Sequence, residues 1–290
     1  MSDKSSSPTR RRFLAGTFTV AAAELATIGS VGAQPGKAKR ADLPKITPGT
    51  NTSFPSLKQV EAGVLTIGYA EVGPASGPVV ILLHGWPYDI YSYVDVAPLL
   101  ASAGYRVIVP YLRGYGTTRF LSSETVRNGQ PSAVAVDIIA LMDTLKIEKA
   151  TIAGYEKYTH DFAKLIWQLA SPKWAFDDAT FDRSAAAFDN PDHVAVVVHN
   201  YRWRLGLADG EPKYDDLEQR LAQFPVIGVP TITLEGDANG APHPQPSAYA
   251  KKFSGKYVHR TIQGGIGHNL PQEAPNAFAE AVVEVDSYAT

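Results

Sequence analysis

Runs of consecutive apolar residues, separated by short polar or glycine-containing segments, recur along most of the chain. The run at residues 79–83 contains no polar residue, which is typical of a strand buried on both faces of a sheet. A hairpin is indicated just before it, because two strand-like segments meet at Ala62-Gly63. In all, the pattern predicts strands at residues 57–60, 64–72, 79–83, 106–109, 151–153, 229–234 and 257–262.

Helices are predicted between several of these strands. Apolar residues recur at helical spacing through residues 131–145, and Pro131 is favourable at the start of a helix. Residues 95–103 also form a helical segment, which Gly104 ends, and a further amphipathic helix is predicted at 156–171. Strands alternating with helices imply a mostly parallel sheet with right-handed crossovers, so the predicted fold class is α/β.

Residues 159–224 depart from this alternation because they are predicted to be helical almost throughout. Residues 195–198 are β-branched enough to form a strand, but Asp189-Asn190-Pro191-Asp192 directly before them is a turn and helix N-cap signal. We therefore interpret residues 193–205 as a helix. The segment 159–224 becomes a helical cap between an N-terminal core part, 56–158, and a C-terminal core part, 225–290.

The first 33 residues are predicted to be an export leader. Thr9-Arg10-Arg11-Arg12-Phe13-Leu14 resembles a twin-arginine signal, a mildly apolar stretch follows, and Val31-Gly32-Ala33 offers small residues for cleavage before Gln34. The leader predicts a bacterial periplasmic protein with no membrane attachment once the signal is removed. A disordered basic tail is the alternative. Residues 34–55 lack periodicity and are predicted to be a linker.

Composition narrows the possible functions. The chain has 290 residues, of which 44% are hydrophobic and 19% charged, as expected for one globular domain with a sizeable core. The absence of cysteine excludes disulfides and thiol catalysis. A formal net charge of -2 argues against a nucleic-acid surface, since no basic stripe is available. A small-molecule substrate is the better expectation, and the oligomeric state is open.

Two loops carry candidate chemistry. His84-Gly85-Trp86-Pro87 follows a buried strand, where its backbone N–H groups can face a developing oxyanion; an ordinary strand-to-helix turn is the alternative. Gly264-Gly265-Ile266-Gly267-His268 follows the last strand and places a histidine on a glycine loop, as a general base requires. The remaining histidines show no metal-ligand spacing, so neither a metal nor another cofactor is predicted.

These loops, Arg113-Gly114-Tyr115-Gly116 and the strand ending at Gly154, taken in this order, resemble the α/β-hydrolase family. Within it, the His-Gly-x-Pro loop resembles the epoxide hydrolase and haloalkane dehalogenase branch. The resemblance implies a three-layer fold with a helical cap, and a nucleophile in a Gly-x-Asp-x-Gly turn. In that branch an ester forms on the Asp and is hydrolysed by a water that a histidine activates.

Carried onto this chain, the resemblance meets departures at the nucleophile turn. Position 156 holds Glu156 in place of the Asp, after Tyr155, and the bulky Tyr158 replaces the closing glycine. Glu156 is the candidate nucleophile, but an exposed carboxylate in the first turn of a helix is the commoner role for such a residue.

The triad acid and the cap show further departures. The acid position of Gly-x-x-Asp holds Asn239, so Asp237, two residues earlier, is the residue predicted to act if an acid is used, with a simple loop cap as its alternative role. An asparagine orients an imidazole but does not stabilise its cation as a carboxylate does. Tyr201, in the cap, is a candidate to polarise an epoxide oxygen, although a packing tyrosine is more common.

Two hypotheses follow. The first is a cofactor-independent hydrolase of epoxides, carbon–halogen bonds or esters, with His268 as base and the loop from His84 to Trp86 facing the oxyanion. The second is a catalytically inactive product that keeps the scaffold. A βα unit of about 30 residues is missing after Gly154, which indicates an internal deletion. Without that strand we expect an exposed sheet edge and therefore marginal stability or association.

Overall fold

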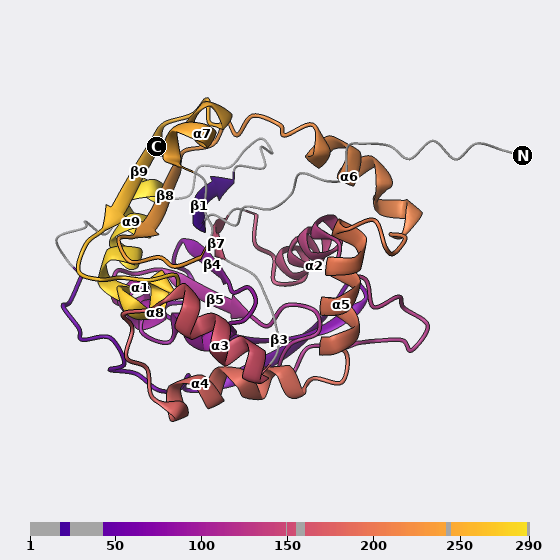
Figure 1. The fold of residues 1–290 in the computed structure, drawn as a ribbon, viewed down its shortest axis with the longest axis horizontal. Coiled ribbons are helices and arrows are strands. Elements are labelled where there is room, and N and C mark those ends of the chain that lie inside the picture. Colours follow the sequence, from indigo (N-terminus) through magenta and orange to yellow (C-terminus); the bar gives the residue numbers. More distant parts are fainter. Residues whose placement is uncertain (1–17, 24–42, 149, 155–159, 242–244, 289–290) are drawn as a thin grey trace, which may run out of the picture.

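A computed structural model of the chain describes residues 18–23, 43–148, 150–154, 160–241 and 245–288. One mixed sheet organises the described residues (Figure 1), with the strand order β2-β3-β5-β4-β7-β1-β8-β9 and β6 beside β3. The strands are β1 (Phe18–Ala23), β2 (Leu57–Ala62), β3 (Leu65–Val72), β4 (Val79–Leu83), β5 (Arg106–Pro110), β6 (Arg119–Phe120), β7 (Ala150–Gly154), β8 (Thr231–Gly236) and β9 (Tyr257–Ile262).

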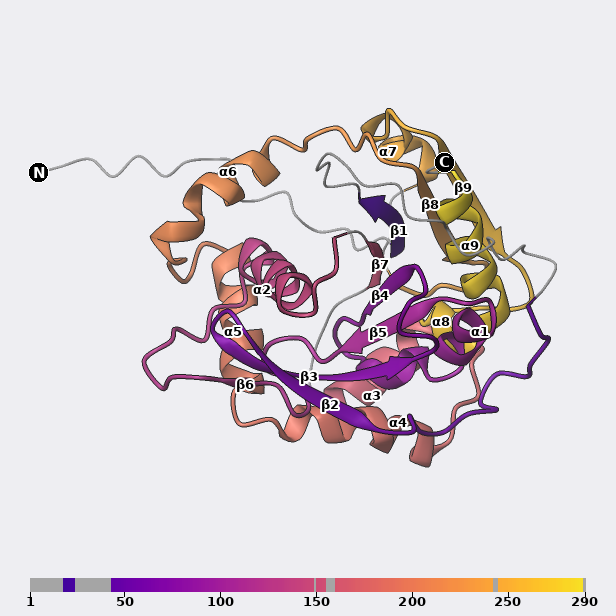
Figure 2. The same ribbon diagram turned by 180° about the vertical axis from the view of Figure 1, so that it is seen from behind.

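Helices cover both faces of the sheet and form the cap. They are α1 (Val96–Ser102), α2 (Pro131–Thr144), α3 (His160–Ala170), α4 (Asp178–Ala185), α5 (His193–Arg204), α6 (Asp215–Ala222), α7 (Pro246–Tyr249), α8 (Leu270–Glu273) and α9 (Pro275–Ser287), with short 3-10 turns between some of them. α1 and α9 pack together on one face, against β5 and β8, whereas α2 lies on the other face against β2 (Figure 2). The α/β fold class is confirmed.

The seven predicted strands are all present, because each apolar run pairs with a neighbour that buries it. Val80, Ile81 and Leu82 of β4 have no exposed surface, as expected of a strand held between β5 and β7 by parallel pairing. The predicted hairpin is formed by β2 and β3, and Gly63 at its turn has a φ of 60°, a left-handed conformation that glycine adopts without strain.

Helices alone fill the described residues between β7 and β8. Residues 195–198 lie inside α5, which confirms their interpretation as helix rather than strand. Asp177 caps α4, since its side chain accepts the Thr180 N–H. The chain therefore returns to the sheet at β8 without a strand in residues 160–230.

The position of residues 18–23 differs from the expectation. The leader, residues 1–33, was expected to lie outside the fold. Residues 18–23 instead form β1, which pairs antiparallel with β7 on one side and β8 on the other. An apolar, uncharged segment serves equally as the centre of an export signal and as a strand inside a sheet. That is the physical reason why the pattern alone does not separate the two.

Residues 43–55, within the predicted linker, lie over the surface of the domain. Leu43 is buried, and the Ile46 N–H donates to Asn276 at the start of α9. The Asp95 carboxylate accepts the N–H groups of Gly49 and Asn51 at 2.6 and 2.8 Å. This segment therefore covers the ends of α1 and α9.

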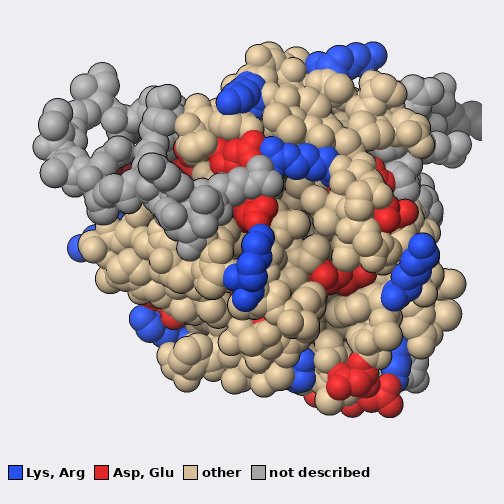
Figure 3. Space-filling model, turned by 90° about the vertical axis from the view of Figure 1, so that its left-hand side faces the viewer, with Lys and Arg blue, Asp and Glu red and all other residues tan. Residues whose placement is uncertain are grey.

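Neither sign of charge dominates the face of the molecule in Figure 3. On the face that Figure 3 shows, lysine and arginine side chains lie scattered among acidic side chains and uncharged surface. None of the helices in the described ranges combines the length and the apolar character that crossing a bilayer requires.

A buried ion pair fixes the segment after β5. The Arg113 guanidinium binds Asp137 of α2 through two hydrogen bonds of 2.6 and 2.7 Å and donates a third to the Asn128 carbonyl. Both side chains of the pair are almost fully buried. The arginine of the Arg-Gly-Tyr-Gly motif thus has a structural partner on the α2 side of the sheet.

We expect Arg113→Ala to lower the free energy of unfolding by roughly 3–5 kcal/mol, because it leaves Asp137 buried without its partner. The double variant Arg113→Met/Asp137→Leu should recover most of that loss. Urea unfolding of both variants tests this, with Lys45→Ala as the control, since its exposed pair with Glu280 contributes at most about 1 kcal/mol. Equal losses for Arg113→Ala and Lys45→Ala would contradict the prediction.

Candidate functional site

The candidate residues gather where β4, β7, β8 and β9 end, on the loops that follow these strands. The strands are parallel to one another, so their carboxyl ends meet at one edge of the sheet, where ligands of open α/β sheets bind. His84, Asn239 and His268 follow β4, β8 and β9 respectively. Tyr155 and Glu156, which follow β7, lie outside the described residues.

The loop after β4 is held by the His84 side chain. Its Nε2 accepts the Leu112 N–H at 3.1 Å, so the ring proton lies on Nδ1, 3.4 Å from the Gly85 carbonyl. Burial lowers the pKa of His84 to about 3, which keeps the ring neutral. The His84 side chain therefore joins the loops after β4 and β5, and it is Gly85 and Trp86 that line a cavity. The Trp86–Pro87 peptide bond is cis.

That cavity is small, about 40 Å³, and lies between the loops and the cap. Leu112 and Tyr115 also line this cavity, and α5 contributes Val196, Val197 and Asn200. Tyr201 of the same helix has a buried phenol oxygen but does not line the cavity.

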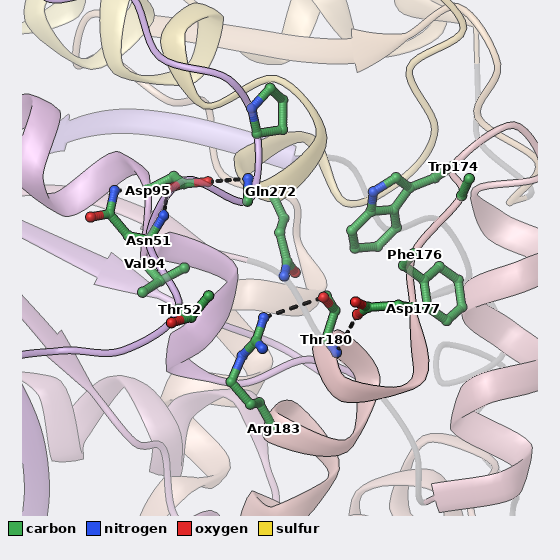
Figure 4. A pocket seen from close by; sticks show the side chains of 13 residues that line it. Asn51, Thr52, Val94, Asp95, Trp174, Phe176, Asp177, Thr180, Arg183 and Gln272 are labelled. Atoms are coloured by element: carbon green, nitrogen blue, oxygen red, sulfur yellow. Dashed lines mark hydrogen bonds between the residues drawn. The ribbon is translucent and has the colours of Figure 1, made fainter.

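A larger cavity of about 280 Å³ lies elsewhere, among residues 48–52, Val94, Asp95 and the segment from Trp174 to Arg183 (Figure 4). Arg183 donates to the Thr180 hydroxyl at its edge. None of the predicted site residues lines it.

His268 is buried, and its Nδ1 lies 2.9 Å from Oδ1 of Asn239. The same Oδ1 accepts the Ala241 N–H at 3.0 Å, which identifies this atom as the amide oxygen. Because an oxygen only accepts here, His268 must donate from Nδ1, and its Nε2 is the nitrogen that carries the lone pair. A fixed tautomer of this kind is what a general base requires.

Asp237 has a different task. Its carboxylate accepts the N–H groups of Gly264, Gly265 and Ile266 at 2.8–3.1 Å, so it caps the loop that carries His268. Burial acts to raise its pKa, but the three N–H donors outweigh that effect and lower it. Asn239, and not Asp237, is therefore the residue that contacts the His268 imidazole. The chain turns after β8, and this turn brings Asn239 towards the ring.

The end of α3 joins the two halves of the site. The Trp167 indole N–H donates to the Pro87 carbonyl at 2.7 Å, and the Ser171 hydroxyl accepts the His268 N–H at 2.8 Å. Gly240, beside Asn239, donates to the Ala170 carbonyl. The fit is close, since a Cβ on Gly267 would lie 2.5 Å from Ser171 atoms. Trp167 and Ser171 were not among the predicted site residues, because in the sequence they are part of an ordinary amphipathic pattern.

Glu273 completes the support of the His268 loop. Its carboxylate accepts the Ser171 hydroxyl and the N–H groups of Gly267 and Asn269. Burial raises its pKa, although these donors partly oppose the shift. In the described parts of the chain, no group of three or more His, Asp or Glu residues is arranged to hold a metal ion.

Comparison with known proteins places the chain in a family. The family model for the alpha/beta hydrolase fold matches residues 78–155. A crystal structure of a "putative epoxide hydrolase" from Klebsiella pneumoniae is 50% identical, with a TM-score of 0.78, and the match covers 81% of this chain and 98% of that one. The chain belongs to the α/β-hydrolase family.

Its relatives lie in the branch of epoxide hydrolases and haloalkane dehalogenases. Epoxide hydrolase A of Mycobacterium tuberculosis is 32% identical over 35% of this chain and 31% of its own length. A haloalkane dehalogenase of Mycobacterium marinum is 48% identical over 18% of each chain. The chain therefore spans less than a third of the length of these curated relatives.

Asp89, in the segment after β4, has a buried carboxyl group and is not among the predicted site residues. Asp89 follows the cis-proline loop, has no exposed surface, and accepts the Tyr91 N–H at 3.0 Å. Burial raises its pKa to about 7, well above the usual value of an aspartate. Folding therefore favours protonated Asp89 up to about neutral pH.

Asp89 should make the free energy of unfolding fall as the pH rises from about 4 to about 7, because the unfolded chain releases this proton near pH 4 and the folded chain only near pH 7. The loss is up to about 4 kcal/mol. His84 and His193, whose pKa values burial lowers to about 3 and about 4, act in the opposite direction below pH 6.5.

The stability difference between Asp89→Asn and the unaltered chain should grow in favour of the variant as the pH rises from 5 to 8, since the amide still accepts the Tyr91 N–H and does not ionise. Urea unfolding across this range measures the effect, and Glu61→Gln, at an exposed carboxylate, is the control. Parallel curves for Asp89→Asn and the unaltered chain would show that Asp89 is ionised throughout.

Proposed function

We propose that this chain is a cofactor-independent hydrolase of the epoxide hydrolase type, with His268 as its general base. The observation that carries the proposal is the Nδ1–Asn239 hydrogen bond, which leaves Nε2 as the basic nitrogen at the carboxyl edge of the sheet. The 50% identity to the Klebsiella pneumoniae protein supports the reaction class. The substrate is a small organic molecule: an epoxide, a haloalkane or an ester.

The proposed step is activation of water. Nε2 of His268 removes a proton as the water oxygen attacks carbon, while the Nδ1 proton stays on the ring, hydrogen-bonded to the Asn239 amide oxygen. The imidazolium that forms is therefore oriented by an amide rather than neutralised by a carboxylate. If the attacked carbon is the carbonyl of an ester on the residue at position 156, its bond to the substrate oxygen breaks and an alcohol leaves. If water attacks the substrate directly, the epoxide carbon–oxygen bond, the carbon–halogen bond or the acyl–oxygen bond of an ester breaks. Gly85 and Trp86 supply the loop expected to face the developing oxyanion.

An inactive scaffold is the second candidate, and a specific observation favours it. The partner of His268 is Asn239, so the triad lacks its acid, and position 156 holds the longer Glu156. The internal deletion that we propose after Gly154 would account for the residue at position 156, and a chain without activity would tolerate Asn239 as well.

Hydrolysis of a panel of epoxides, haloalkanes and activated esters should be lost in His268→Ala and should rise by at least about tenfold in Asn239→Asp, because a carboxylate stabilises the imidazolium. His199→Ala is the matched control, since among the described residues the hydrogen bonds of its ring nitrogens go to backbone groups of Gly129 and Asp209. Equal rates for the unaltered chain and His268→Ala would establish the inactive scaffold.

A single turnover in ¹⁸O-labelled water identifies the attacking group. If a carboxylate at position 156 forms an ester, the first product carries unlabelled oxygen from the protein and the label enters the carboxylate; direct attack by water labels the product at once. Glu156→Gln separates the two routes further, since only the covalent route requires an ionised carboxylate there.

We also propose that the leader directs export through the twin-arginine route to the bacterial periplasm. Replacing Arg10, Arg11 and Arg12 together by lysine keeps the positive charge but removes the arginine pair. We expect the tagged triple variant to stay in the cytoplasmic fraction while the unaltered chain reaches the periplasm. The same distribution for both proteins would show that the arginine motif does not direct export.

A further inference from the structure

A single strand, β1, lies between β7 and β8 in the sheet. Each residue in the middle of β1 has a partner on both sides: Val20 faces Ala153 and Ile232, and Ala21 faces Ile152 and Thr231. Neighbouring strands are about 4.8 Å apart, so β7 and β8 are separated by about 10 Å. The space between them, which we call the strand slot, accommodates one strand.

We propose that the strand slot is a strand-acceptor site and that the leader segment Phe18–Ala23 occupies it as an integral part of the folded chain. The inner edges of β7 and β8 carry N–H and C=O groups that need partners inside a protein. β4 and β9 satisfy only the outer edges. β1 supplies the missing partners along both inner edges.

The leader segment suits the slot chemically. Phe-Thr-Val-Ala-Ala-Ala contains no charge, no proline and no glycine, so it can lie in the middle of a sheet and donate an N–H at every position. Five of its six residues pair with β7, and four pair with β8. Helix α9 packs over it, as over the neighbouring β8.

The direction of β1 shows that it does not belong to the regular alternation. β7 and β8 are both antiparallel to β1, whereas a βα unit between them would add a parallel strand. A segment arriving from the other end of the chain is under no such constraint. Cleavage after Ala33 would cut the chain outside β1, so processing need not remove the strand.

Engineered disulfides test the position of β1 directly, because the chain has no cysteine of its own. Ala21→Cys/Ile152→Cys places two thiols on opposed residues of β1 and β7, and Thr19→Cys/Thr233→Cys does so for β1 and β8. Opposed residues of an antiparallel pair lie about 4.5–5.5 Å apart, within the range of a disulfide.

The matched controls shift one partner by a single residue: Ala21→Cys/Ala153→Cys and Thr19→Cys/Ile232→Cys. Their thiols lie on opposite faces of the sheet. We expect both opposed pairs to oxidise within one chain, as seen by mass and on non-reducing gels, and the shifted pairs to stay reduced. Failure of either opposed pair, or equal oxidation of the shifted pairs, would overturn the proposal.

Nicking the full chain tests whether the strand stabilises the fold. With a specific protease site inserted between Ala33 and Gln34 and cut after folding, we expect the leader fragment to elute with the body and to leave only in denaturant. Ala21→Pro should release the fragment, because proline lacks the N–H that a doubly paired strand needs, and Thr27→Pro, outside the strand, should not.

Release of the unaltered fragment from a body that remains monomeric, with the same urea midpoint, would overturn the proposal. Release of the Ala21→Pro fragment followed by association of the body would support it, since the inner edges of β7 and β8 would then be exposed. These readouts need no activity, so they stand or fall separately from the proposed hydrolase function.

Discussion

The hydrogen bond from the Trp167 indole to the Pro87 carbonyl is the contact on which the arrangement of the site depends. It ties helix α3 to the loop after β4, while Ser171, one turn further along, ties the end of the helix to the loop after β9. Trp167 is fully buried and stacks on Trp174, with Tyr88 tilted against it. A large aromatic side chain with one polar atom can thus hold two loops at a fixed separation.

This separation matters because the two halves of the site belong to different blocks of the sheet. The β4 and β7 block carries the His-Gly-Trp-Pro loop, and the β8 and β9 block carries Asn239 and His268. No described residue connects the blocks by direct strand pairing except those of β1. The end of α3 binds loops of both blocks, and β1 pairs with one strand of each block. These two connections between the blocks are therefore independent of each other.

Much of the fold follows from local pattern, because a strand between two parallel neighbours must be apolar on both faces and a helix on the sheet must be apolar on one. The position of His268, on a glycine loop after the last strand, also followed from the sequence, whereas its role as a base stays a proposal. The choice between Asp237 and Asn239 was not, because it depends on how the chain turns after β8. A sequence shows the charge of Asp237 but not the three N–H groups that use it.

The residues that depart from the family pattern at the nucleophile turn follow β7 in the chain, and the antiparallel strand β1 pairs with β7. β7 has the antiparallel β1 as a neighbour, and its last residue, Gly154, pairs with Thr19 of β1. The base half rests instead on β8 and β9, which pair fully with each other and are reinforced by Asp237, Ser171 and Glu273. Loss of a βα unit would thus disturb the nucleophile side first and leave the loop of His268 ordered, whereas Asn239 is a departure that lies on the base side itself.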